Sequence, residues 1–343
     1  MSRTGARARR GACAVAGLVV AALVVRAAIG GGAQVGHAAD LLSHPRLGWL
    51  TLAVAFEILA YAAYAAGQRH LLHAVGRPLS IRWLASLSVA AQCLNNFLPL
   101  GYVAANVLNF RELRRRELGS AATAWALLMS SLLYVGALAL LALLGSEIAG
   151  GRGGAAASDL RLGAYAALGL ALVCGLAAFV LARRGQLARI LGPRLHARAR
   201  NVRTQLSGIA LSKRRAGAAS GLFLSGWLAD AACLAAAFVA VGGTPPWSIF
   251  LMAYSAAQLV AFLPITPGGI GLVEGSLTLT LAAGGGTHAH VLAAVLLYRL
   301  ISYWGTLPAG TLGYLAVRRN GARLAEPPAE AAPFALAGVA PAP

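Results

Sequence analysis

The sequence predicts an all-α polytopic membrane protein with about six full transmembrane helices and two re-entrant hairpins of broken helices, arranged as an inverted repeat. The first observation is composition: the 343 residues are 59% hydrophobic and 11% charged, with a mean hydropathy of +0.70, whereas soluble domains carry about 25% charged residues. The second is that several apolar runs reach about 20 residues, enough to cross roughly 30 Å of hydrocarbon. The third is that two further apolar stretches are interrupted by proline and glycine, as in broken helices that line an intramembrane cavity.

The full spans are oriented by the cationic residues. Five blocks hold 24 of the 29 cations: Arg3–Arg10, Arg69–Arg82, Arg111–Arg116, Arg183–Arg215 and Arg318–Arg323. If all five are cytoplasmic, the positive-inside rule is satisfied, so the net charge of +19 reflects topology and no nucleic-acid partner is expected. The basic N-terminus also fits a signal peptide, but no clean cleavage site follows, which favours a retained first helix. The expected spans are 11–29, 47–67, 119–145, 160–182, 216–241 and 289–317.

This topology divides the chain into two membrane halves. The stretch 83–110 begins and ends beside cytoplasmic blocks, and its 28 residues are too few for two full spans. We therefore expect a re-entrant hairpin with its tip near Asn95–Gly101. The stretch 247–286 starts and ends on the outer side, so it is expected to enter from the opposite face with its tip at Pro264–Gly269. The expected order is a cytoplasmic N-terminus 1–10, a first half 11–145, an outer loop 146–159, a second half 160–317 with the basic loop 183–215, and a disordered cytoplasmic tail 318–343.

Matching residues in the two halves support the repeat. Glu57 and Asp230 lie in the middle of the corresponding second helices. Matches among leucine, alanine and phenylalanine are weak evidence in so apolar a chain, whereas glutamine and proline matches carry more weight. Three matches recur at offsets of 164 to 166: Gln92 with Gln258, Phe97–Pro99 with Phe262–Pro264, and Leu133–Tyr134 with Leu297–Tyr298.

Glu274 and Arg299 are ionisable residues within apolar segments, where charges are costly and usually mark a function or a pairing. With Thr266 as a helix cap and Pro267 as the first helical residue, Glu274 lies about 10 Å along its helix, which is too deep for a capping residue. Arg299 lies about 15 Å into the last span by the same rise. Two interpretations stay open: a structural ion pair, or an Arg299 that binds an anionic group such as phosphate through its planar fork, with Glu274 orienting it.

The other polar residues also have two interpretations each. Glu57 and Asp230 have no basic partner nearby in sequence, so they serve either proton coupling or a hydrogen-bonded helix contact. Asn95, Asn96 and Gln258 either line a hydrophilic groove for substrate or bond neighbouring helices. Gly268 and Gly269 either present backbone amides to an anion or allow tight packing. The basic loop 183–215 either binds anionic lipid headgroups or only sets topology.

Signals for an enzyme are weak. The sole lysine is Lys213, so a phosphate-binding Gly-x-x-x-x-Gly-Lys-Ser/Thr loop is absent from the sequence. The pairs His70/His73 and His288/His290 have no supporting carboxylate. We therefore expect no catalytic residue, metal site or cofactor.

A family resemblance rests on residues 258–310. They contain Phe262-Leu-Pro-x-x-Pro-Gly-Gly-Ile-Gly-x-x-Glu274, then Leu297-Tyr-Arg299 and Tyr303-Trp304. This pattern resembles the flippase-like transmembrane family, which includes the membrane region of bacterial lysylphosphatidylglycerol synthases. The segment from Asn95 to Gly119 resembles the first-half signature more loosely, and its Pro-Leu-Gly-Tyr departs from the usual glycine-richer form.

The resemblance covers most of residues 45–318 and implies a polytopic inner-membrane protein related to lipid flippases, with Glu274 and Arg299 at matching motif positions. In the full synthases a soluble C-terminal domain transfers the aminoacyl group. This chain ends shortly after Arg319 with an alanine- and proline-rich tail, so we expect that activity to be absent.

The leading hypothesis is a translocator of a lipid or lipid-linked anionic headgroup in the bacterial cytoplasmic membrane, with both termini cytoplasmic. The alternatives are a secondary transporter of a small anion and a non-transporting partner subunit of an envelope-lipid enzyme. The expected partners are membrane phospholipids or a lipid-linked substrate, and anionic headgroups at the basic loops; a homo-oligomer is also compatible with the sequence.

Overall fold

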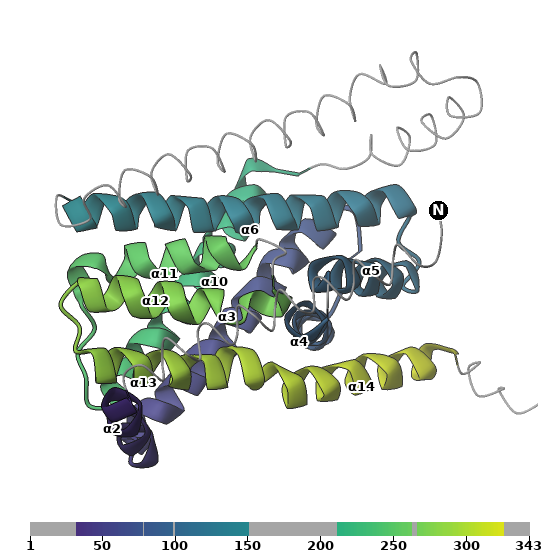
Figure 1. Cartoon of the computed structure of the whole chain (residues 1–343). Coiled ribbons are helices and arrows are strands. Elements are labelled where there is room, and N and C mark those ends of the chain that lie inside the picture. Colours follow the sequence, from purple (N-terminus) through teal and green to yellow (C-terminus); the bar gives the residue numbers. More distant parts are fainter. Residues whose placement is uncertain (1–31, 78, 99, 151–210, 263–265, 326–343) are drawn as a thin grey trace, which may run out of the picture.

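The computed structural model describes residues 32–77, 79–98, 100–150, 211–262 and 266–325 (Figure 1). These residues form helices and no strands, which agrees with the predicted all-α class. The expected spans 11–29 and 160–182, the N-terminus 1–10 and most of the basic loop 183–215 lie outside the described residues.

Four helices in the described part of the chain are long and apolar enough to cross a membrane. They are α3 (Leu47–Ala74), α6 (Ser120–Ala149), α10 (Lys213–Ala240) and the continuous rod His288–Arg319. Each coincides with an expected span, so the prediction of a multi-pass helical protein is confirmed at this level. A short helix, α2 (Gly32–Ser43), precedes them and packs against the start of the rod.

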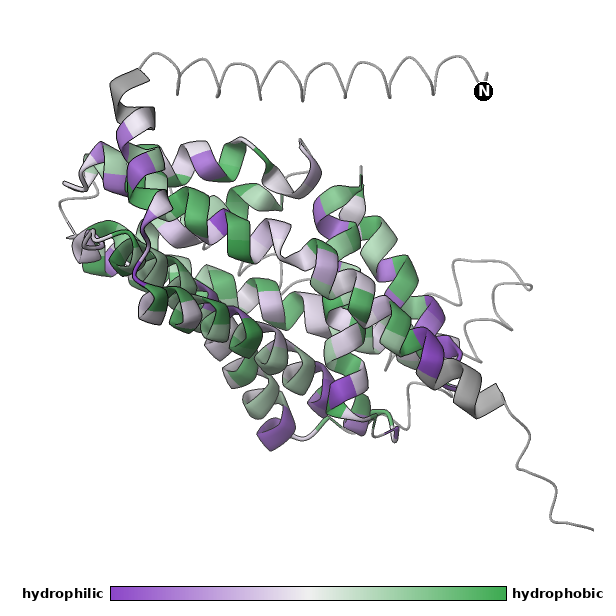
Figure 2. Ribbon diagram, turned by 90° about the horizontal axis from the view of Figure 1, so that it is seen from below, coloured by the Kyte–Doolittle hydropathy of each residue, from purple (hydrophilic) through white to green (hydrophobic). Residues whose placement is uncertain are grey.

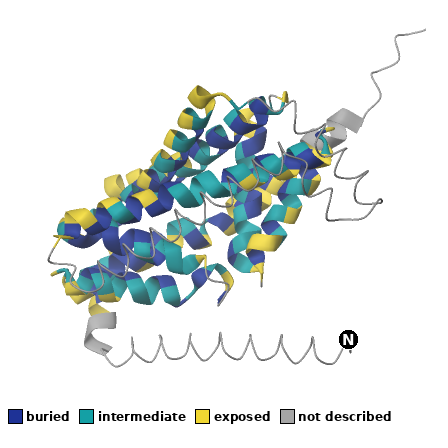
Figure 3. Cartoon of the chain, turned by 90° about the horizontal axis from the view of Figure 1, so that it is seen from above, coloured by how far each residue is buried: buried dark blue, intermediate teal, exposed yellow. Residues whose placement is uncertain are grey.

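The outer surface of the bundle is apolar. Ile58, Leu279 and Leu312 are 65%, 74% and 67% exposed, and hydrophobic residues occupy most of the length of the helices (Figure 2). Buried residues lie on the inward faces of the same helices (Figure 3). Large apolar side chains that point outward along long helices are typical of contact with lipid hydrocarbon, where no water is available to be excluded.

The first interrupted stretch forms two short packed helices. These are α4 (Ile81–Phe97) and α5 (Gly101–Arg114), of 17 and 14 residues. Leu100 adopts φ 57°, which reverses the chain between them. The start of α4 and the end of α5 lie close together, because Arg77, just before α4, contacts Glu117, just after α5, at 3.5 Å. The predicted break near Asn95–Gly101 is therefore present.

The second interrupted stretch is built in the same way. α11 (Trp247–Ala261) and α12 (Leu272–Ala283), of 15 and 12 residues, pack against each other and are joined through a 3₁₀ turn, η2 (Pro267–Gly269). The side chain of Ile249, near the start of α11, packs on Gly284 just beyond the end of α12. The start and the end of this pair are thus neighbours as well.

The two helix pairs adjoin opposite ends of the bundle. The backbone N–H of Arg46 donates to the carbonyl of Ala240 at 2.8 Å, so α3 begins where α10 ends, and these two antiparallel helices share the most extensive helix–helix contact of the described residues. Gly226 allows this approach, since a Cβ there would lie 3.3 Å from the carbonyl oxygen of Ala60. Because α4 follows the end of α3 and α11 follows the end of α10, the two pairs start about 40 Å apart at a rise of 1.5 Å per residue.

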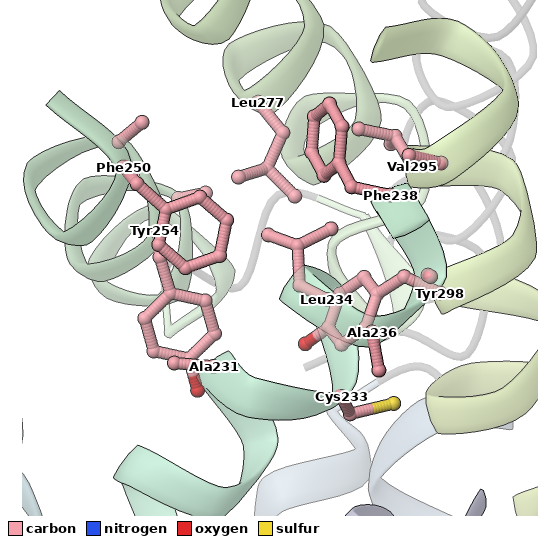
Figure 4. Close-up of a cluster of buried hydrophobic side chains, with 14 of the residues drawn as sticks. Ala231, Cys233, Leu234, Ala236, Phe238, Phe250, Tyr254, Leu277, Val295 and Tyr298 are labelled. Atoms are coloured by element: carbon pink, nitrogen blue, oxygen red, sulfur yellow. The ribbon is translucent and has the colours of Figure 1, made fainter. Parts of the chain in front are cut away.

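The main hydrophobic cluster lies where α10, α11, α12 and α13 (His288–Arg299) meet (Figure 4). Leu234 and Phe238 from α10 contribute to the same cluster as Leu277 from α12 and Val295 from α13. Tyr254 and Tyr298 are buried in it and supply its polar atoms. This cluster fixes the second helix pair against the rest of the bundle.

The C-terminal rod contains a local irregularity. The last span was expected as one helix over 289–317, and the rod His288–Arg319 covers it, with a π turn, η3 (Leu300–Trp304), between α13 and α14 (Thr306–Ala325). Pro308 gives a physical reason, because it lacks an N–H and its ring clashes with the carbonyl four residues earlier. The tail 318–343 was expected to be disordered; α14 continues to Ala325, and residues 326–343 lie outside the described residues.

The sidedness of the two helix pairs is a testable prediction. In a cysteine-free background, Arg77→Cys next to the first pair and Thr244→Cys next to the second are expected to react with a membrane-impermeant maleimide from opposite sides, since both positions are exposed and lie at opposite ends of the bundle. Labelling of intact and of permeabilised cells measures this. Reaction of both positions from one side would contradict the inverted arrangement.

Candidate functional site

Arg299 lies at the last turn of α13, directly before the π turn, and is only 8% exposed. Its Nε donates to Oε1 of Glu274 at 2.6 Å, and its Nη2 donates to the carbonyl of Gly268 at 3.1 Å. The guanidinium lies over the ring of Tyr303, 4.5 Å from the ring centroid. In this arrangement the electron-rich face of the ring attracts the positive charge of Arg299. These contacts use Nε and Nη2, while the Nη1 group takes no part in them.

Glu274 does cap its helix, contrary to expectation. Its Oε2 accepts the backbone N–H of Gly271 at 2.7 Å, and its Oε1 binds Arg299. The expectation failed because α12 begins at Leu272 rather than at Pro267. Gly268 and Gly271 adopt φ values of 56° and 83°, a left-handed conformation that glycine tolerates and that delays the start of the α-helix. One carboxylate thus serves both the helix end and the ion pair.

The tips of the two helix pairs meet beside Arg299. Tyr303 donates its hydroxyl to the carbonyl of Asn96 at 2.8 Å, and the Asn96 amide donates to Oγ1 of Thr306 at 3.1 Å. Gly268 packs so closely that a Cβ there would lie 2.9 Å from Cα of Asn96. Asn96 lies in the last turn of α4, at the tip of the first pair, and Gly268 lies in the turn of the second. We call the set of Asn96, Gly268, Glu274, Arg299, Tyr303 and Thr306 the tip junction.

Two hydroxyl groups in segments adjoining the tip junction have no hydrogen-bond partner among the described residues. They are Oγ1 of Thr266, next to Pro267, and Oγ of Ser302, in the π turn, and both atoms are buried. Buried polar atoms are normally satisfied. These two hydroxyls are therefore free to bond an additional polar group such as a ligand oxygen.

A second polar cluster lies around Asp230 of α10. Its carboxylate accepts the hydroxyl of Tyr254, the side-chain amide of Gln258 at 2.8 Å and the hydroxyl of Tyr298 at 2.9 Å. Gln258 also donates to Tyr298 at 2.8 Å. These residues come from α10, α11 and α13, so one carboxylate ties three helices together. Tyr298 immediately precedes Arg299, which makes this cluster a direct neighbour of the tip junction.

Glu57 of α3 adds a second carboxyl group to this cluster. It is 8% exposed and lies within hydrogen-bonding reach of Asp230 and of the hydroxyl of Tyr61. Its Oε2 is buried and has no hydrogen-bond partner in the part of the chain that the structure describes. The two mid-helix carboxyl groups that sequence reasoning treated separately are therefore in contact. We call Glu57 and Asp230 the carboxyl pair.

Comparison with known proteins assigns the chain to a family. Residues 14–310 match the family model described as the lysylphosphatidylglycerol synthase TM region. The chain belongs to this family. The match includes both helix pairs and the tip junction, and it confirms the resemblance drawn from the motif around Glu274 and Arg299.

One curated relative of the chain is a "UPF0104 membrane protein" of Methanothermobacter thermautotrophicus. It is 38% identical over 85 residues. The alignment covers 24% of this chain and 24% of the relative, so the chain matches about a quarter of the relative's length. Both descriptions support a membrane protein.

The structure of this chain brings together only some of the predicted binding residues. Asn96, Gly268, Glu274 and Arg299 meet in the tip junction, whereas Gln258 belongs to the cluster around Asp230. Gly269 is buried, and a Cβ there would meet Val273 and Ala261. Asn95 is half-buried at the end of α4.

Sequence reasoning missed the roles of four polar residues: Tyr254, Tyr298, Tyr303 and Thr306. A helical spacing signal was available for two of them, since residues four apart share a helix face. Tyr254 lies four residues before Gln258, and Tyr303 lies four residues after Arg299. Among the described residues, no group of three or more histidine, cysteine or acidic side chains could hold a metal ion.

Proposed function

We propose that this protein translocates a lipid or lipid-linked anionic headgroup across the cytoplasmic membrane. The observation that carries the proposal is the position of Arg299: it is a buried cation between the tips of two broken helix pairs, and it forms an ion pair with Glu274. Broken helices that meet inside a bundle are where membrane transporters place their substrate sites. An arginine there matches phosphate, because its fork donates parallel hydrogen bonds to two oxygens.

The proposed contacts follow from the donors at the tip junction. The Nη1 group of Arg299 donates to a phosphate oxygen, and the unpaired hydroxyls of Thr266 and Ser302 supply further hydrogen bonds. Glu274 neutralises Arg299 when no headgroup is bound, which avoids an isolated charge at depth. The acyl chains stay in the bilayer, in contact with the apolar outer surface of the helices.

The proposed location and lipid partners rest on charge. Cations concentrate in five blocks that we place on the cytoplasmic side together with both termini. Anionic headgroups at this surface gain about 1 kcal/mol per nearby cation, so the basic blocks raise the local concentration of an anionic lipid substrate.

A reconstitution assay tests the proposal. Purified protein in unilamellar vesicles is expected to accelerate the exposure of fluorescently labelled phosphatidylglycerol to dithionite quenching, relative to protein-free vesicles. Zwitterionic and uncharged labelled lipids serve as substrate controls. Equal rates with and without protein, for every lipid class, would contradict translocation.

The same preparation distinguishes the alternatives. A secondary transporter of a small anion would accumulate a radiolabelled water-soluble organic phosphate in vesicles and leave lipids unmoved. A partner subunit of a lipid enzyme would do neither, and it would co-purify in fixed stoichiometry with one enzyme. Either result would replace the lipid proposal.

A further inference from the structure

Two carboxyl groups meet in the interior of the bundle and have no cation between them. Glu57 comes from α3 and Asp230 from α10, the two helices with the most extensive mutual contact in the described chain. Two carboxylates in contact cannot both be ionised, because the repulsion in a water-poor site exceeds any compensation available there. At least one proton is therefore held by the pair.

The hydrogen bonds indicate which member holds it. Asp230 accepts three donors, from Tyr254, Gln258 and Tyr298, and charge-assisted bonds of this kind favour the ionised form. The Oε2 atom of Glu57 is buried and has no hydrogen-bond partner among the described residues, and an ionised carboxylate would leave that oxygen uncompensated. The arrangement suits a protonated Glu57 that donates to an ionised Asp230.

We infer that the carboxyl pair is a proton site, in which Glu57 carries one proton shared with Asp230, and that its protonation controls the packing of the second helix pair. When the pair takes up a second proton from water, an O–H bond of the donor hydronium breaks and an O–H bond to an Asp230 oxygen forms, while Glu57 keeps its own proton. Asp230 then loses its charge, and its three hydrogen bonds weaken. Since these bonds hold α11 and α13 to α10, the change loosens the helices that carry the tip junction.

A proton fits this site better than a metal ion. The groups that surround Asp230 direct O–H and N–H donors at it, whereas a bound cation needs the lone pairs of those oxygens. The titratable groups that face the pair come from five helices, and one of them is a cation: Tyr61, Tyr134, Cys233, Tyr254, Tyr298 and Arg299. The positive charge of Arg299 stabilises the negative charge on Asp230, and Arg299 also forms an ion pair with Glu274.

Infrared spectroscopy of the full chain in lipid nanodiscs tests the proton site directly. At neutral pH the wild type is expected to show the C=O band of a protonated carboxylic acid, which Glu57→Gln removes. Asp230→Asn is expected to keep the band and shift its frequency, because the acceptor of the Glu57 proton has changed. Glu117→Gln, which alters an exposed carboxylate with a side chain 81% accessible, is the matched control and keeps the band unchanged. A wild type without this band, or a band that survives Glu57→Gln, would overturn the inference.

Control of translocation by this proton rests on the proposed function and is measured separately. In the vesicle assay, an imposed pH gradient is expected to change the rate of lipid exposure in the wild type and in Glu117→Gln, and to have no effect in Glu57→Gln. An equal response of Glu57→Gln and wild type would refute the control. Lipid-inactive wild-type protein would refute the proposed function, while the infrared band still decides whether the proton site exists.

Discussion

Alanine in place of Arg299 is expected to abolish lipid translocation and to lower the free energy of unfolding by about 3–5 kcal/mol, the usual cost of removing one partner of a buried ion pair. The change leaves the Glu274 carboxylate without its counter-charge and removes the bond to the Gly268 carbonyl at 3.1 Å. Translocation is measured in vesicles, and stability by reversible denaturation of the same preparation in detergent. Undiminished translocation in folded protein would show that Arg299 only holds the structure together.

A double variant separates these roles. Arg299→Leu combined with Glu274→Gln removes both charges, and replacement of a buried pair by neutral groups is often close to neutral in stability. Glutamine can still accept the N–H of Gly271 as the helix cap. We expect most of the lost stability to return and translocation to stay absent. Recovery of both would assign the pair a purely structural role.

Arg77→Ala is the matched control for the loss of an arginine ion pair. Arg77 and Glu117 lie 3.5 Å apart, and their side chains are 52% and 81% exposed. Exposed pairs contribute about 0–1 kcal/mol, so this variant is expected to unfold almost like the wild type and to retain translocation. A large effect here would mean that the assay responds to any loss of positive charge.

Gly268→Ala is expected to have the second largest effect, because it separates the tips of the two helix pairs. Gly268 adopts φ 56°, and a Cβ there would lie 2.5 Å from a ring carbon of Tyr303 and 2.9 Å from the backbone of Asn96. The left-handed conformation costs an L-residue about 1–2 kcal/mol, and overpacking adds about 1–3 kcal/mol. Thermal unfolding measures the loss, and reduced translocation is expected with it.

Gly242→Ala isolates the backbone part of this effect. Gly242 also has a positive φ, 79°, but a Cβ there would meet no atom of the described chain within 4 Å. It is therefore expected to lose only the conformational part, about 1–2 kcal/mol, and to keep translocation. If the two alanine variants were equally stable, the close contact at the tip junction would contribute nothing.

The helix breaks and the Glu274–Arg299 pair were predictable because their signals are local. Proline and glycine interrupt an apolar run at 262–271, and two opposite charges at membrane depth invite pairing. The start of α12 was not predictable from period or composition, since it depends on the left-handed turns at Gly268 and Gly271. The π turn was missed for a similar reason. The composition of an apolar stretch does not distinguish an α-helical turn from a π turn, which has one additional residue.

The contact between Glu57 and Asp230 could have been predicted from the sequence, but the sequence analysis did not predict it. The two residues were interpreted as equivalent positions of an expected inverted repeat, and equivalent positions near the axis of such a repeat would approach each other. That step requires knowing that the two helices cross at these residues, which is set by small residues such as Gly226 and by packing along α3 and α10.

By itself, the sequence determined that this is an all-helical membrane protein with two broken helix stretches and a buried charge pair, because apolar length, cation position and proline–glycine interruptions act along the chain. Only the tertiary structure decided that the two tips touch, that Glu274 both caps α12 and binds Arg299, and that two carboxyl groups share one site. The hydroxyl of Tyr303 and the carbonyl of Asn96 are 207 positions apart in the chain. Their approach depends on how the long helices pack, and no local pattern specifies that packing.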